Sequence, residues 1–76
     1  MNFIAIADII GERANQDAKW GEQNHSNDRW LTILMEEVGE MAKELLERDA
    51  VCYRAELVQV AAVAVAMLEA FDRNGL

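Results

Sequence analysis

Two acidic clusters hold the residues of this chain best suited to chemistry. They are Glu36-Glu37-Val38-Gly39-Glu40 and Glu56-Leu57-Val58-Gln59. Residues three and four apart share a helix face, so Glu36 and Glu37 both neighbour Glu40, and each like-charged pair repels by roughly 0.2–0.5 kcal/mol. A divalent cation would turn this repulsion into binding, because hard cations such as Mg²⁺ prefer carboxylate oxygens. The spacing therefore predicts a metal site.

Three helices must position these clusters. No proline and only four glycines among 76 residues favour an all-α chain. We expect helices over residues 2–19, from about 28 to about 48, and over 51–73. Asn27 or Asp28 is the expected N-cap of the second helix, after a polar connection rich in turn-forming residues. Residues 1–76 are thus predicted to form a single all-α domain, an antiparallel helical bundle of about three helices.

Apolar positions predict how these helices pack. From Leu57 to Leu68 only Gln59 is polar, so the third helix is apolar nearly all round and must be covered from several sides. Three helices of this size cannot enclose one of their own number, so we expect oligomerisation to complete the bundle, as a homodimer or homotetramer. Trp30 is expected in the core. The first helix carries an apolar stripe formed by Phe3, Ile6, Ala7, Ile10 and Ala14.

The charge and the apolar content of the chain limit the kinds of partner that it is expected to bind. The formal net charge of −7 disfavours nucleic acid, since phosphate binding depends on Lys and Arg, and any free nucleotide would need a bridging metal ion. The longest apolar run, Val60 to Leu68, is far short of the roughly 20 residues that span a bilayer, so no membrane association is expected. The lone Cys52 is expected to be a partly buried small hydrophobe. A small chain without disulfides suits the cytoplasm.

The second and third helices, joined by a short link near Asp49, are expected to face each other. Glu40 lies nine residues before Asp49 and Glu56 seven after it, so at about 1.5 Å rise per residue they lie at similar heights. Glu37 shares a face with Glu40, and Glu56 shares one with Gln59. Facing pairs of this kind build metal sites in helical bundles. Their oxygen ligands favour Mg²⁺ or Mn²⁺ over zinc.

Glu36-Glu37-x-x-Glu40 followed by Glu56-x-x-Gln59 resembles the EExxE…ExxD pattern of the all-α nucleoside triphosphate pyrophosphohydrolases. The chain is most similar to small MazG-like members, relatives of the dimeric dUTPases. The likeness extends from about Trp20 to Phe71 and includes the motif Trp20-Gly21-x-Gln23-x-His25. It implies Mg²⁺-dependent hydrolysis of a nucleoside triphosphate to the monophosphate and pyrophosphate.

The same resemblance implies the role of each acidic residue. Glu37, Glu40 and Glu56 would be metal ligands, and Glu36 a further ligand or the base that orients the attacking water. Gln59 departs from the pattern, because the family normally has Asp there. A carboxamide oxygen can ligate a cation but brings no charge, so metal affinity should fall. This departure leaves two alternatives open: a non-catalytic metal or nucleotide sensor, and a structural oligomerisation module.

Residues near the polar connection are candidates to bind substrate. Trp20 would stack on a base or anchor its loop, and His25 would contact substrate or cap the following helix. Lys19 is a candidate to steer phosphate, as are Arg13 and Lys43.

Overall fold

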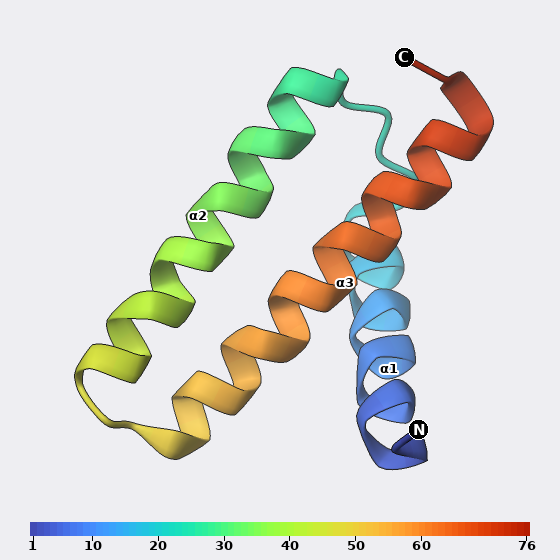
Figure 1. Ribbon diagram of the computed structural model, residues 1–76. Coiled ribbons are helices and arrows are strands. Elements are labelled where there is room, and N and C mark those ends of the chain that lie inside the picture. The colour runs from blue at the N-terminus through green and yellow to red at the C-terminus, as the bar shows by residue number, and fades with distance from the viewer.

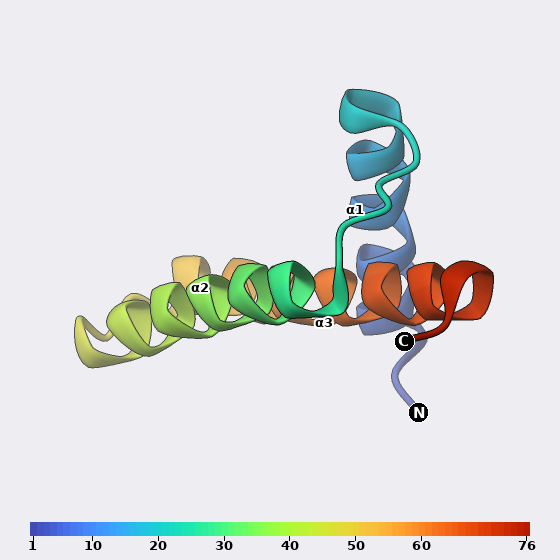
Figure 2. The ribbon, with the colours of Figure 1, turned by 90° about the horizontal axis from the view of Figure 1, so that it is seen from above.

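All 76 residues are described by a computed structural model, which contains three α-helices and no strand. Helix α1 spans Phe3–Trp20, α2 spans Asn27–Leu46 and α3 spans Ala50–Asn74. Figure 1 shows α2 and α3 as an antiparallel hairpin. Seen from above in Figure 2, α1 runs steeply across this hairpin, and it packs against α3 without touching α2. The prediction of an all-α chain with three helices is confirmed.

Each helix begins and ends at residues suited to those positions. Asn2, Ser26 and Asp49 each accept a hydrogen bond from a first-turn backbone N–H, at 2.9, 3.2 and 3.0 Å. Gly21 and Gly75 end α1 and α3 with φ of 70°, a conformation that costs glycine little. The predicted N-cap of the second helix was wrong by one residue. Ser26 is the N-cap instead, and its hydroxyl oxygen accepts the hydrogen bond from the Arg29 N–H.

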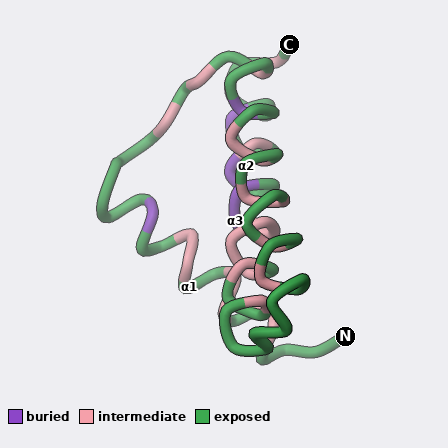
Figure 3. The backbone as a smooth tube through the Cα atoms, turned by 90° about the vertical axis from the view of Figure 1, so that its left-hand side faces the viewer, coloured by how far each residue is buried: buried purple, intermediate pink, exposed green.

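The core lies where α2 meets the C-terminal half of α3, as Figure 3 shows by its buried segments. Trp30 is only 3% exposed, which confirms its predicted core position. It packs in one cluster with Val63, Ala66 and Ala70. Ala62, Ala66 and Ala70 recur every four residues, so they share one face of α3. Small side chains on that face let neighbouring helices approach closely.

The apolar stripe predicted for the first helix faces the hairpin only in part. Phe3 is 82% exposed and Ile10 64% exposed, whereas Ile9 is half-buried and Gln16 is buried. Because α1 packs closely against α3 alone, one narrow face is covered, and Ile6 is the only member of the stripe that is half-buried. Helix α3 also leaves large apolar side chains exposed, namely Val51, Leu57, Val65, Leu68 and Phe71.

Helix α3 is long and apolar enough to cross a membrane by length and composition, with a mean hydropathy of 1.6 in its most apolar stretch. This is weak evidence, because the central helix of a bundle passes the same test. Two of its charged residues pair with α1: Arg54 with Asp8 at 2.8 Å and Glu69 with Arg13 at 2.7 Å. These pairs are typical of a helix packed among other helices.

Candidate functional site

Glu37 of α2 and Glu56 of α3 bring their carboxyl groups together across the hairpin. Both side chains are half-buried. Burial raises the pKa of Glu37 above its ordinary value, and a hydrogen bond with the Glu56 carboxyl and the charges of Glu56, Glu40 and Glu36 raise it further. Two ionised carboxylates have no proton between them, so a hydrogen bond between Glu37 and Glu56 requires one of the two to be protonated. When both are ionised, they repel each other.

One oxygen of this pair has no partner within the chain. Oε2 of Glu56 is shielded from solvent and accepts no hydrogen bond. A buried acceptor without a donor costs about 1–3 kcal/mol, and more when it is charged. A hard divalent cation would relieve both this cost and the repulsion from Glu37. Glu37 and Glu56 thus offer the oxygen chemistry that the predicted metal prefers, together with this orphaned atom, but no third acidic ligand atom gathers with them within 4.8 Å.

The remaining acidic residues surround the pair at the surface. Glu36 and Glu40 are exposed, one on either side of Glu37 along α2. Their charges reach Glu37, since both contribute to its raised pKa. The structure therefore places Glu37 opposite Glu56, with Glu36 and Glu40 open to solvent beside them.

An open cavity of about 290 Å³ adjoins the acidic pair. Glu37 and Gln59 line it together with two residues predicted to contact substrate, Trp20 and His25. Residues from α1, the connection after it, α2 and α3 all take part, which brings together positions far apart in the sequence. Its other lining residues are Gln16, Gln23, Arg29, Trp30, Ile33 and Val63.

The aromatic and basic residues of the cavity region differ in how firmly they are held. His25 is half-buried and meets Trp30 edge-to-face, with ring centroids 4.8 Å apart. Trp20 is 55% exposed, and the Nζ of Lys19 lies 4.7 Å from the centroid of its ring. Lys19 is itself exposed and does not line the cavity. An exposed indole at a cavity edge is available for stacking, whereas His25 is fixed by its neighbour.

The connection between α1 and α2 is tied to the C-terminal end of α3. Arg73 donates to the backbone oxygen of Gln23 at 3.0 Å and to Oδ1 of Asn24 at 3.2 Å. Asn74 donates to the same Asn24 oxygen at 2.9 Å. Because this connection carries Gln23 and His25 to the cavity, these bonds set the position of one cavity wall. Nothing in the local sequence pattern pointed to Arg73.

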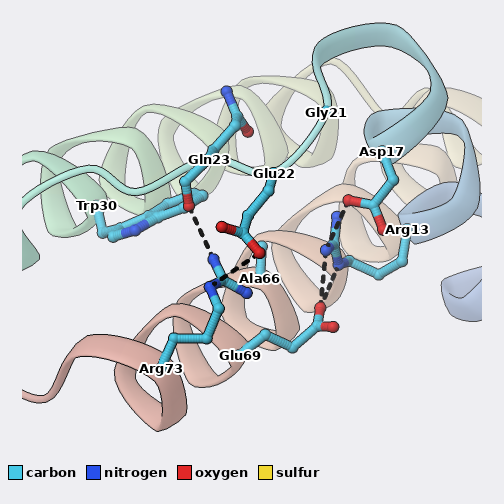
Figure 4. A pocket seen from close by; sticks show the side chains of 9 residues that line it. All are labelled: Arg13, Asp17, Gly21, Glu22, Gln23, Trp30, Ala66, Glu69 and Arg73. Carbon is cyan, nitrogen blue, oxygen red and sulfur yellow. Dashed lines mark hydrogen bonds and ion pairs between the residues drawn. The ribbon is translucent and has the colours of Figure 1, made fainter.

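Arg13 is not free to steer phosphate, contrary to the prediction. Its guanidinium contacts Glu69 at 2.7 Å and Asp17 at 3.0 Å, and donates to Oε1 of Gln16 at 2.9 Å. Figure 4 shows Arg13 between these two carboxylates in a second cavity of about 330 Å³, which also holds Arg73. That cavity contains neither Glu37 nor Glu56 and shares only Gln23 and Trp30 with the first.

Glu44, Asp49 and Cys52 form another group with closely spaced ligand atoms, at the turn between α2 and α3. Their proximity follows from helix capping, because Asp49 accepts the Cys52 N–H. Cys52 is exposed, so its predicted partial burial was wrong; it lies in the exposed first turn of α3. A hydrogen bond to Asp49, followed by the charge of Asp49, raises the pKa of the thiol. A protonated thiol is a poor partner for a hard cation.

No protein-family model, curated protein or solved structure matches this chain. The resemblance to MazG-like pyrophosphohydrolases therefore stays a prediction from the residues that carry it.

Proposed function

We propose that this chain is a Mg²⁺-dependent nucleoside triphosphate pyrophosphohydrolase that releases the monophosphate and pyrophosphate. The observation that carries the proposal is the meeting of Glu37 and Glu56 across the hairpin, with a buried Glu56 oxygen that has no donor. The adjoining cavity of about 290 Å³ supports it, because a pocket of this size is large enough to hold a portion of a nucleotide.

In this proposal the acidic residues have two roles, metal binding and proton transfer. Glu37, Glu40 and Glu56 hold the cation, with the Gln59 amide oxygen in the fourth position. Mg²⁺ bound there would neutralise phosphate charge and lower the pKa of water. Glu36, exposed beside the ligands, accepts a proton from the attacking water.

The residues at the other end of the cavity hold the nucleoside. Trp20 offers an aromatic face for stacking on the base. His25, fixed against Trp30, closes the wall beside it. Lys19 stands outside the cavity, near enough to Trp20 to attract phosphates as they approach.

We further propose that two copies pair through the exposed apolar side chains of α3. The chain exposes 5442 Å², whereas a compact monomer of 8.6 kDa exposes about 4,700 Å². The excess is close to the roughly 800 Å² that each partner contributes to a standard interface. Leu68→Glu should therefore yield monomers in analytical ultracentrifugation, while Leu46→Glu, at the far end of the hairpin, should not. A monomeric wild type would refute the pairing.

Two other functions have specific support. Gln59 brings no charge to the fourth ligand position, which favours a sensor that binds metal or nucleotide without turnover. The exposed apolar surface favours a structural oligomerisation module.

One set of titrations separates these functions. Mg²⁺ and Mn²⁺ are titrated by calorimetry into wild type, Glu56→Gln and the exposed control Glu47→Gln, and pyrophosphate release is then assayed on canonical and modified triphosphates. The enzyme requires binding and turnover in wild type and in the control, and loss of both in Glu56→Gln. Metal binding without turnover favours the sensor. If Gln59→Asp then gained turnover, the lack of catalysis in wild type would be due to Gln59. No heat of metal binding in any variant would leave only the structural module.

A further inference from the structure

Gln16 is the only buried polar residue of the chain, with 8% of its surface exposed. It lies on α1 and lines the cavity beside the acidic pair. Burying an amide is costly unless its groups are hydrogen-bonded. Its oxygen is satisfied, since Oε1 accepts from Nη1 of Arg13 at 2.9 Å. Its nitrogen makes no hydrogen bond within the chain.

Arg13 fixes which way this amide points. A guanidinium has only donors, so it must face the oxygen of Gln16 and not the NH₂ group. Arg13 is itself held by Glu69, through Nε at 2.8 Å and Nη2 at 2.7 Å, and by Asp17 at 3.0 Å. Figure 4 shows Arg13 held between Glu69 and Asp17. A rotation of the amide by half a turn would set donor against donor. The NH₂ group is therefore the polar group of Gln16 that has no partner within the chain, on a residue that lines the cavity.

We propose that Gln16 selects the ligand by donating a hydrogen bond to an acceptor on its planar ring, with Arg13 as the positioning residue. This inference rests on the proposed function in taking the cavity as a nucleoside site. The acceptor is a carbonyl oxygen or an unprotonated ring nitrogen. Trp20, exposed at the edge of the same cavity, provides a stacking face for that ring. Trp30 also lines this cavity, and its buried N–H has no acceptor within the chain.

Nucleosides without phosphate test the inference, because their binding needs no metal. Deoxyuridine, deoxycytidine, deoxyadenosine and deoxyguanosine are titrated into the full chain, with NMR shifts of the Gln16 NH₂ and Trp20 indole as readouts. At least one nucleoside should bind and move the Gln16 NH₂ resonances. Gln16→Glu keeps the shape and the Arg13 contact but turns the donor into an acceptor, and it should weaken that nucleoside by about tenfold or more. Unchanged affinity, or no nucleoside bound by wild type, would overturn the proposal.

Arg13 is tested separately as a positioning residue. Arg13→Met frees the amide to rotate and should weaken the same nucleoside several-fold, whereas Arg13→Lys keeps a donor at the oxygen and should restore affinity. Equal loss in both variants, or in neither, would contradict the role of Arg13.

The two proposals fail in different measurements. Nucleoside binding through Gln16 without pyrophosphate release would leave the inference intact and refute the enzyme. Pyrophosphate release with a nucleoside preference unchanged in Gln16→Glu would support the enzyme and refute the role of Gln16.

Discussion

At a pH above the raised pKa of Glu37, where both carboxylates are ionised, replacing Glu37 by Gln should stabilise the metal-free protein. The amide places a donor opposite the Glu56 carboxylate, and a hydrogen bond to a charged group contributes about 1.5–3 kcal/mol. It also removes the repulsion from Glu40, worth roughly 0.2–0.5 kcal/mol. For a domain of 60–100 residues each kcal/mol raises Tm by about 4–8 °C. The variant should therefore melt at least about 6 °C above wild type in the presence of a chelator.

With divalent cations present, wild type should become more stable than Glu37→Gln. If Mg²⁺ binds wild type, a concentration of about 100 times Kd adds roughly 2.7 kcal/mol to its stability. Glu37→Gln, which lacks one charged ligand, should gain far less. Melting curves by circular dichroism, with and without Mg²⁺, measure both effects. Glu47→Gln is the matched control, since Glu47 is exposed at the end of α2, and it should change Tm little in either condition.

The same substitution predicts a pH dependence. Because the pKa of Glu37 is raised in the folded protein, the native state binds more protons than the unfolded state between the ordinary and the raised value. Its contribution to stability is present below the ordinary pKa and is lost as pH rises through the raised one. Wild type should lose stability over this window relative to Glu37→Gln. A variant that is less stable than wild type at every pH, or that keeps the full Mg²⁺ response, would refute this account of the pair.

Three further substitutions have definite expected outcomes. Trp30→Ala removes the largest core side chain and should cost about 3–5 kcal/mol, seen as a large drop in the urea midpoint; a small drop would contradict its core role. Asp49→Asn should lower the thiol pKa of Cys52 and speed its alkylation by iodoacetamide near neutral pH, as followed by mass spectrometry. Arg54→Ala breaks an exposed pair with Asp8 and should change the free energy of unfolding by at most about 1 kcal/mol; a larger loss would show that the pair is not merely superficial.

Local features of the chain were enough to predict its helices. Each predicted boundary lies within about two residues of the observed one, because caps such as Asp49 and Gly75 act through bonds to the adjacent turn. The side of α1 that would be covered was predicted wrongly. Its apolar stripe suggested one face, but α1 packs closely against a single neighbour, and the side that packs there bears Ile9 and Gln16 and only Ile6 of the stripe. The covered side of α1 depends on where the neighbouring helix lies, and hydrophobic periodicity carries no information about that.

The candidate site divides in the same way. Spacing alone placed Glu37 with Glu40, and Glu56 with Gln59, because a helix fixes the angle between residues three apart. Which carboxylate meets Glu56 depends on how α2 and α3 slide and rotate against each other, and packing on the small face of α3 sets that register. The long-range bonds that orient Gln16 arise in the same manner, since Arg13 and Glu69 are 56 residues apart.

Three helices, their ends and an acidic face were determined by the sequence itself, because caps and helical periodicity act over a few residues. Only the tertiary structure decided that Glu37 lies against Glu56, that the Gln16 amide oxygen is held by Arg13, and that Arg13 is engaged within the chain. These outcomes depend on contacts between helices, whose register follows from the packing of Trp30 against the alanine face of α3.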